Sequence, residues 1–390
     1  MRTAVVVLSL SLVPLLAIAD PGTAPVIGGT DAPAGKWPDV AGVFFAGTTP
    51  ECTGTLIAPN VVITAGHCVG GITSVLIGTS SLARQAEGDM VPVKQTIEYP
   101  DSQNSIDVAV LVLTRDSTKE PRKLATGWAS LDIKNGASIS IVGYGAVDKT
   151  AMMYVNELKE ATTTITDADC TSHPGDCSAA AQPAGELGAG GMGIDTCPGD
   201  SGGPLYLPTD YGTFLAGVTS RGYNNNVYDC SEGGLYERPD KVASWIEKVT
   251  QTKVARGPEP SVPESLSGVG GHLIEAQIDA NDPKSENHTY AITTQPMHAK
   301  AAVHDDGHLR VCTDPGAVAM DSFALSVTDK NDPSRTLSFT IPLQITEGAA
   351  GDGCDVEDFD SGGCCDSGRS AGGSLPLGIG VLVLLRRRRR

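Results

Sequence analysis

Three short segments contain the residue types that nucleophilic catalysis needs. His67 lies in the run TAGHC, Asp107 opens the apolar run DVAVLVL, and Ser201 lies in the run GDSGGP. A serine hydroxyl is a weak nucleophile at neutral pH, so a histidine must take its proton and later return it to the leaving group. A buried carboxylate must hold the imidazole in one tautomer and stabilise the imidazolium that forms. The three residues therefore predict a Ser-His-Asp triad for acyl transfer.

The glycines around Ser201 predict a second part of the same machinery. A tetrahedral intermediate carries an oxyanion, which needs N–H donors that converge on one point. Glycine adopts backbone conformations that other residues avoid, so the run GDSGGP can turn tightly enough to aim two N–H groups together. We expect the N–H groups of Gly199 and Ser201 to form this oxyanion hole.

At these segments the chain resembles the chymotrypsin family, and most closely its trypsin branch. The resemblance covers about residues 26–250 and includes VIGG at 26–29 and the chain order His, Asp, Ser. It implies a secreted serine endopeptidase with two packed six-stranded antiparallel barrels and the triad in the cleft between them. Protein or peptide substrates would be its partners.

The same resemblance assigns roles in substrate binding. The residue six before the nucleophile lies at the base of the primary specificity pocket, and here it is Asp195. A desolvated carboxylate favours a cation, so we expect cleavage after Arg or Lys. Gly222 and Gly234 match the glycines that keep the pocket open, and Ser220 matches the residue beside the triad acid. If Asp195 does not reach the pocket, a chymotrypsin- or elastase-like preference is the alternative.

Two positions depart from the family pattern. Arg221 stands where the family usually has tryptophan, which changes the upstream subsites. Pro25, rather than Arg or Lys, precedes Val26. In the family a new N-terminus, here Val26, inserts and pairs with the carboxylate before the nucleophile, here Asp200. Because Pro25 has no basic side chain, a separate activating protease is expected, and the chain is interpreted as a zymogen.

Ten cysteines in an exported chain predict disulfides. No Cys/His cluster has the spacing of zinc ligands, so no metal is expected in the protease region. The family resemblance implies three bridges: Cys52–Cys68, Cys170–Cys177 and Cys197–Cys230. The pairing of the other four cysteines stays open; they are Cys312, Cys354, Cys364 and Cys365.

The spacing of apolar residues predicts an all-β fold. Short β-like runs are separated by Gly, Pro and Asn, with no alternation of strands and helices. One helix is expected near residue 245, because Val242, Trp245, Ile246 and Val249 follow helical spacing. The pattern alone favours an all-β barrel or sandwich. With the family resemblance, the expected fold class is all-β, with two six-stranded antiparallel barrels and a C-terminal helix, followed by a small β-sandwich.

The remaining segments predict export and surface display. The apolar N-terminus ends in Ala-Ile-Ala and fits a signal peptide. The C-terminus resembles the myxobacterial sorting signal (MYXO-CTERM), with a Cys motif, a short apolar run and five arginines. Transient membrane contact, cleavage by a sorting protease and display on the outer cell surface would follow. The expected order is signal peptide 1–19, propeptide 20–25, protease domain 26–250, linker 251–265, sandwich 266–346, flexible segment 347–374 and sorting tail 375–390.

Residues 266–346 resemble a cadherin- or immunoglobulin-like repeat, which implies a spacing or adhesive role. Asp279, Asp282, Asp329 and Asp332 offer hard oxygen ligands, so calcium is one interpretation; acidic turn residues are the other. The linker, rich in proline and charge, favours an extended spacer.

The net charge of −18 argues against nucleic acid or an anionic membrane as the main partner. A catalytically idle homologue that acts as a surface adhesin is the rival interpretation.

Overall fold

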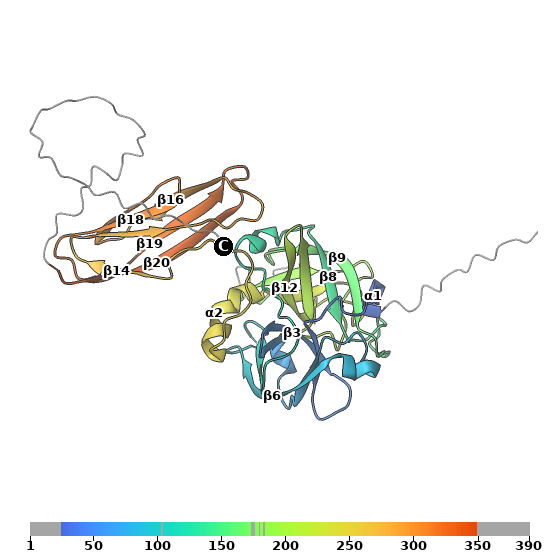
Figure 1. The fold of residues 1–390 in the computed structure, drawn as a ribbon. Coiled ribbons are helices and arrows are strands. Elements are labelled where there is room, and N and C mark those ends of the chain that lie inside the picture. The colour runs from blue at the N-terminus through green and yellow to red at the C-terminus, as the bar shows by residue number, and fades with distance from the viewer. Residues whose placement is uncertain (1–24, 103, 173–175, 179, 182–183, 349–390) are drawn as a thin grey trace, which may run out of the picture.

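The computed structural model describes residues 25–348, except for positions 103, 173–175, 179, 182 and 183. Figure 1 shows a larger body of two β-barrels and a separate β-domain that lies beyond α2 (Pro239–Thr250). The expected signal peptide, the propeptide up to residue 24 and the sorting tail fall outside the described residues, as does the expected flexible segment from residue 349 on. Within the described residues, no helix combines the length and apolar character needed to cross a bilayer.

The first barrel closes in the strand order β2-β3-β4-β7-β6-β5. Its strands are rich in Val, Ile and Leu, and their side chains fill the barrel interior. β4 and β7 pair so that Thr64 faces Ala109, which brings the segments next to these strand ends together. The bounds are β2 (Val40–Phe44), β3 (Cys52–Ala58), β4 (Val61–Thr64), β5 (Ser74–Ile77), β6 (Asp89–Glu98) and β7 (Ala109–Leu113).

The second barrel runs in the order β9-β10-β13-β12-β11-β8, and β8 pairs with β9 to close it. The short β1 adds to the edge of β9. The all-β prediction with two six-stranded antiparallel barrels is confirmed. The bounds are β1 (Thr30–Asp31), β8 (Ser138–Gly143), β9 (Lys159–Asp167), β10 (Glu186–Ala189), β11 (Pro204–Thr209), β12 (Gly212–Gly222) and β13 (Gly234–Glu237).

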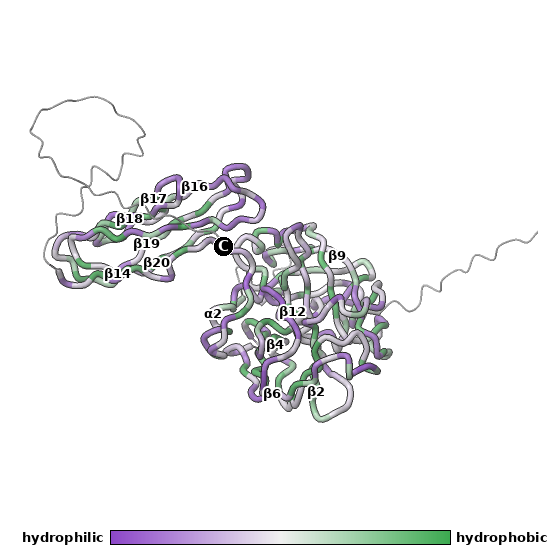
Figure 2. Tube along the Cα trace, in the orientation of Figure 1, coloured by the Kyte–Doolittle hydropathy of each residue, from purple (hydrophilic) through white to green (hydrophobic). Residues whose placement is uncertain are grey.

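One hydrophobic core joins the two barrels. It contains Val40 and Ile57 from the first barrel and Tyr206 and Val218 from the second. Trp37 stacks on Tyr206 with ring centroids 4.5 Å apart. Figure 2 colours the chain by hydropathy; the segments labelled β2 and β4 consist mostly of apolar residues, and all their residues are buried. The two barrels therefore pack against each other over a shared apolar core.

The helical elements are short. The predicted helix is α2, which buries Val242, Ala243 and Ile246 against the barrels. The other elements are α1 (Pro25–Gly28), η1 (Gly66–Cys68), η2 (Leu82–Glu87) and η3 (Gly127–Asp132). Inside α1, Val26 and Ile27 have non-helical dihedral angles, so this element is a tight bend rather than a regular helix.

The C-terminal domain has two sheets, in the orders β14-β20-β19-β16 and β15-β18-β17. Alternating residues such as Phe323, Leu325 and Val327 point into its core, while their neighbours stay accessible. The bounds are β14 (Leu266–Val269), β15 (Leu273–Gln277), β16 (His288–Thr294), β17 (Ala299–Val303), β18 (His308–Thr313), β19 (Ala319–Asp329) and β20 (Thr336–Thr346).

The sandwich contacts the two-barrel domain through η3. Trp128 is fully buried in the core cluster of the sandwich, and its Nε1 donates to the carbonyl of Ala280 at 2.6 Å. Asp132, at the end of η3, accepts from Lys284 at 2.9 Å and from Arg335 at 3.0 Å. These contacts tie the two domains by an apolar anchor and a charge cluster.

The linker is extended, but it is not a free spacer. The N–H of Trp128 donates to the carbonyl of Pro258 at 2.9 Å. Gly257 N–H donates to Thr126 Oγ1 at 3.0 Å, and Val254 is buried. Proline and charge predict an extended chain here, but sequence composition does not reveal the surface on which the chain lies.

Candidate active site

Strand pairing brings His67 and Asp107 together. His67 lies in η1, just after β4, and Asp107 lies just before β7, the strand that pairs with β4. The N–H of His67 donates to Asp107 Oδ1 at 2.8 Å, and Nδ1 lies 2.7 Å from Oδ2. Because an ionised carboxylate only accepts hydrogen bonds, this contact places the ring proton on Nδ1. Nε2 is then available as a base.

Glycine is required at position 66 because of this close approach. A Cβ atom on Gly66 would lie 2.7 Å from the side chain of Ser102 and 2.9 Å from Asp107 Oδ1. A larger residue would push η1 away from the carboxylate. The run TAGHC therefore provides both the histidine and the space that it needs.

Asp107 is held by a second donor from the other barrel. Ser220, near the end of β12, donates its Oγ–H to Asp107 Oδ2 at 2.7 Å. Burial raises the pKa of Asp107, but the hydrogen bond and charge of His67, with the donation from Ser220, outweigh this effect and leave the pKa below its usual value. Asp107 is therefore ionised over the neutral range.

Backbone contacts hold Ser201 against β3 and against Cys68, the residue that follows His67. Its carbonyl accepts from the N–H of Thr53 at 2.9 Å and lies 3.7 Å from Cys68 Sγ. Gly202 has φ +79°, and a Cβ there would lie 2.1 Å from Thr64 Oγ1. Within the described residues, no hydrogen bond joins the Ser201 hydroxyl to His67. Such bonds are often loose before substrate binds.

The N–H groups next to the hydroxyl are available to an oxyanion. Gly199 has φ +96°, and its carbonyl is held by Thr53 Oγ1 at 2.9 Å. In the part of the chain that the structure describes, the N–H groups of Gly199 and Ser201 donate to no protein acceptor. Two unpaired donors two residues apart in a glycine turn suit an oxyanion.

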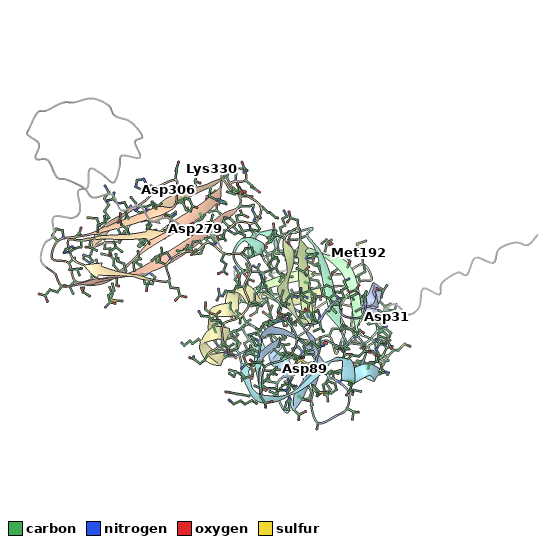
Figure 3. The ribbon with its side chains drawn as sticks, viewed as in Figure 1. Asp31, Asp89, Met192, Asp279, Asp306 and Lys330 are labelled. Atoms are coloured by element: carbon green, nitrogen blue, oxygen red, sulfur yellow. A yellow bond between two sulfur atoms is a disulfide. The ribbon has the colours of Figure 1, made fainter. Side chains whose placement is uncertain are left out.

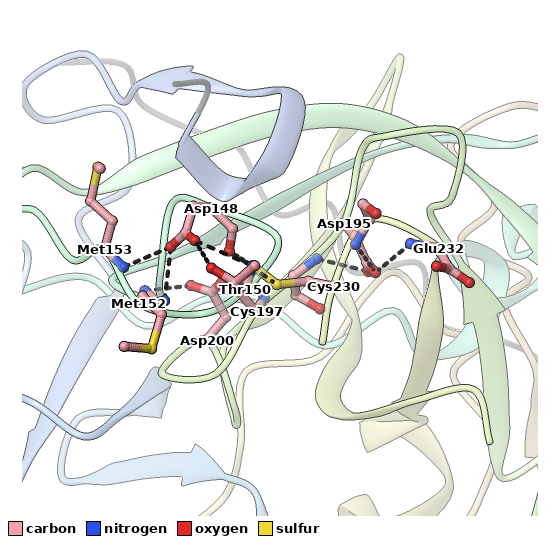
Figure 4. The surroundings of a disulfide bond; sticks show 12 residues. Asp148, Thr150, Met152, Met153, Asp195, Cys197, Asp200, Cys230 and Glu232 are labelled. Atoms are coloured by element: carbon pink, nitrogen blue, oxygen red, sulfur yellow. Dashed lines mark hydrogen bonds between the residues drawn. A yellow bond between two sulfur atoms is a disulfide. The ribbon is translucent and has the colours of Figure 1, made fainter. Parts of the chain in front are cut away.

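Asp200 is fully buried on one side of the Cys197–Cys230 disulfide (Figure 4). Its carboxylate accepts from the N–H of Gly145 at 2.7 Å and from that of Cys197 at 2.9 Å. Burial raises its pKa to about 7 despite these two donors.

Val26 is also buried, in the core of the second barrel, with φ 35°. In this chain Val26 is preceded by Pro25, so no ammonium is available to Asp200 from that position.

A pocket of about 190 Å³ opens beside Ser201. Its walls include Ser220, Gly222 and Asp229. Gly222 pairs with Gly234, where a Cβ would lie 2.5 Å from the carbonyl of Arg221. Both predicted pocket glycines therefore lie at the paired ends of β12 and β13, and the second has no room for a side chain.

Asp195 lies next to this pocket but is not among its lining residues. It is 2% exposed and lies across the Cys197–Cys230 disulfide from Asp200 (Figure 4). Its carboxylate accepts four backbone N–H groups at 2.8 to 3.1 Å, from Thr196, Ser231, Glu232 and Gly233. Burial raises the pKa of Asp195 above its usual value although these donors oppose the effect.

The structure contains the three disulfides named above, Cys52–Cys68, Cys170–Cys177 and Cys197–Cys230. Among the described residues, one group of possible metal ligands comes together, Cys170, Cys177 and Glu186. Its two cysteines are in a disulfide, so they are not thiolate ligands.

The acidic residues considered for calcium lie in the sandwich, where Figure 3 labels Asp279. The Asp282 carboxylate lies 3.6 Å from Arg335 and 3.5 Å from His288. Asp329 accepts from Ser285 Oγ at 2.9 Å. Protein groups therefore surround two of the four residues, and calcium binding stays a prediction.

Sequence reasoning missed two features of the site. Asp229 lines the pocket, and its position directly before Cys230 could have suggested this. Glu186 and Glu237 lie under Arg221, and no local sequence signal marks them. They face each other only because β10 and β13 pair.

The family model for trypsin matches residues 26–246. The chain belongs to the trypsin family.

This trypsin-family protein is 32% identical over 264 residues to serine protease 56 of Mus musculus, covering 62% of this chain and 41% of that protein. It thus spans less than half the length of that relative. It is 29% identical over 242 residues to brachyurin of Leptuca pugilator, covering 59% of this chain and 99% of that protein. Among solved structures, neuropsin, a serine protease expressed in the limbic system of mouse brain, matches with a TM-score of 0.48 and 28% identity. That match covers 57% of this chain and 98% of neuropsin.

Proposed function

We propose that this protein is a serine endopeptidase that hydrolyses peptide bonds through Ser201, His67 and Asp107. The observation that carries the proposal is the double contact of His67 with Asp107, which leaves Nε2 available as a base, while Ser201 contacts the adjacent Cys68. In the mechanism, Nε2 takes the proton of the Ser201 hydroxyl as its oxygen attacks the substrate carbonyl. The C–O bond to Ser201 forms, and the carbonyl electron pair moves onto the oxyanion held by the N–H groups of Gly199 and Ser201.

Collapse of this intermediate breaks the C–N bond, and His67 returns the proton to the leaving amine. Water then attacks the acyl-enzyme by the same route and releases the acid. Asp107 stays ionised throughout and stabilises the imidazolium, because its lowered pKa disfavours its protonation. A catalytically idle homologue that acts as an adhesin would not need the hydrogen bonds of His67 and Ser220 to Asp107.

Ser201→Ala should abolish peptide hydrolysis while the protein stays folded, because the residue contributes a hydroxyl and little packing. The residual rate should be ~10³-fold or more below wild type, since only the oxyanion hole and binding remain. Turnover of a fluorogenic peptide, normalised to protein with a wild-type unfolding profile, measures this. Near-normal turnover by the folded variant would contradict the triad assignment.

The proposed specificity is cleavage after Arg or Lys. Two carboxylates, of Asp195 and Asp229, lie at or beside the pocket, and neither has an ion-pair partner among the described residues. A substrate cation would supply the missing counter-charge. One observation favours the alternative, a chymotrypsin- or elastase-like preference. Asp195 is buried, accepts four backbone N–H groups and is not among the lining residues of the pocket.

Asp195→Ser should lower kcat/KM for Arg and Lys substrates by about 10²-fold, because the buried counter-charge is lost. Asp229→Asn is the matched control at the pocket wall, where solvent screens the charge, so a smaller loss is expected. A panel of fluorogenic peptides with different residues before the cleaved bond measures both. Wild-type preference for Phe, Leu or Ala would overturn the assignment.

We also propose that Val26 becomes the N-terminus and that its ammonium pairs with Asp200. A fully buried carboxylate with two N–H donors and no cation is costly, which supports this role. Because Pro25 does not suit a pocket next to Asp195, a separate protease or an aminopeptidase would expose Val26.

A form that begins at Asp20 should be largely inactive, and a form that begins at Val26 active. The pH dependence of stability should also differ. In the Asp20 form the pKa of Asp200 is about 7 in the folded protein and 3.8, the ordinary value, in the unfolded chain. The contribution of Asp200 to the free energy of unfolding is therefore fully present below about pH 4. This stability is lost as the pH rises to about 7. In the Val26 form the ammonium should lower the pKa and reverse the trend. Urea unfolding from pH 4 to 8 measures this, and equal activity of the two forms would contradict the switch.

The N- and C-terminal segments support export followed by display on the cell surface. The mature protein should then lack residues 1–19 and the arginines at 386–390. Intact mass and terminal sequencing of the native protein measure both ends. Recovery of peptides that contain Leu385-Arg386 from the mature form would count against sorting.

A further inference from the structure

Two glutamates face each other beneath the cleft wall. Glu186 opens β10 and Glu237 closes β13, and the register pairs them directly. Both are 0% exposed. Like charges opposite each other on adjacent strands are destabilising, and a buried carboxylate without a partner is more costly still. This pair therefore needs a cation, a proton or both.

Arg221 supplies the cation. Its Nη2 donates to Glu186 Oε1 at 2.7 Å, and its Nη1 lies 3.5 Å from Glu237 Oε1. Nη2 also donates to the carbonyl of Asp176 at 2.9 Å. The guanidinium is thus turned inward to the protein, and its charge is balanced there by Glu186.

The charged form of the second glutamate is disfavoured. Burial, with the charge of Glu186 next in effect and that of Asp107 also contributing, raises the pKa of Glu237 far above its usual value, although Arg221 opposes the shift. The cluster then holds one positive and one negative charge. It adds no net charge beside the triad acid.

The cluster contacts the triad through Ser220. Arg221 Nη1 donates to Ser220 Oγ at 3.2 Å, and Ser220 Oγ donates to Asp107 Oδ2 at 2.7 Å. The same Oδ2 lies 2.7 Å from His67 Nδ1. A register shift between Thr219 and Arg221 marks a β-bulge, which lets two consecutive side chains reach the same place. Because Arg221 occupies a lone pair of the hydroxyl, the Ser220 proton is directed at Asp107.

We propose that Arg221, held by its ion pair with Glu186, is a positioning residue that fixes the Ser220 hydroxyl, and through it Asp107 and His67, for the reaction. The proposal rests on the proposed function in that the reaction is triad hydrolysis. It gives a role to the position where the family usually has tryptophan: in this chain a hydrogen-bonded ion pair replaces apolar packing. Arg221 also lines the pocket beside Ser201, but a residue with this positioning role acts on the chemical step, so its loss should change kcat more than KM.

Arg221→Met tests the role, because it keeps an apolar stem and removes the donors. With rates normalised to titrated active sites, kcat should fall about tenfold with KM within about twofold, since small displacements of catalytic groups slow the chemical step. The matched control is Arg84→Met, at an exposed Arg–Glu pair in η2, where no change is expected. An unchanged kcat, or a rise confined to KM, would overturn the proposal.

Arg221→Met leaves Glu186 without its cation, so the variant could lose its fold. The double variant Arg221→Met/Glu186→Gln removes both charges of the pair and, like the single variant, leaves no side-chain donor at position 221 for Ser220 Oγ. It should show the same fall in kcat. If it hydrolyses peptides at the wild-type kcat, the proposal is wrong.

A measurement without substrate separates this inference from the proposed function. In wild type the His67 Nδ1 proton, held between ring and carboxylate, should give a downfield proton NMR resonance. In both Arg221 variants it should move upfield and broaden, because Asp107 is less well fixed. If wild type hydrolyses no peptide, the proposed function fails. The inference about Arg221 is then tested by the His67 Nδ1 proton resonance alone, compared between wild type and the variants. An identical resonance in wild type and variants would overturn the inference whatever the activity.

Discussion

The arrangement of the site depends on one carboxylate, that of Asp107, which accepts hydrogen bonds from both barrels. His67 donates to it from the first barrel, and Ser220 donates to it from β12 of the second. A buried carboxylate is stable only when donors replace its hydration. The packing of one barrel on the other therefore also completes the hydrogen bonding of Asp107. Stability and the geometry needed for catalysis have the same cause here.

The surrounding structure keeps this contact rigid. The core between the barrels, with Trp37 stacked on Tyr206, limits their relative motion. The Cys52–Cys68 bridge lies next to His67, and the Cys197–Cys230 bridge separates Asp195 from Asp200. Each loop that carries a site residue is thus tied to a strand end or a disulfide. Sites held in this way retain their geometry better than sites on free loops.

The C-terminal sandwich is part of the same assembly. Trp128 reaches from η3 into the sandwich core, and Asp132 binds Arg335 and Lys284. Loss of the sandwich would expose a large aromatic side chain and leave Asp132 without these two cations. The linker follows the protease surface, so the two domains are joined over more than one point.

Much of the site could be predicted because its signals are local. TAGHC and GDSGGP keep a histidine or a serine together with the glycines that its turn requires, and the spacing of Val242 and Ile246 marks α2. What could not be predicted depends on pairing between distant segments. Glu186 and Glu237 meet only through the register of β10 and β13, and Trp128 meets Ala280 across 152 positions of sequence. Composition carries no information about such partners.

The most direct test of the account is the rate at which a fluorophosphonate labels the protein that begins at Val26. Such a probe reacts with a serine only when a base activates the hydroxyl and an oxyanion site accepts the phosphoryl oxygen. The account predicts one label per chain, mapped to Ser201 by mass spectrometry, and a labelling rate that falls ~10³-fold or more in His67→Ala. A label at another residue, or equal rates in the two proteins, would contradict it.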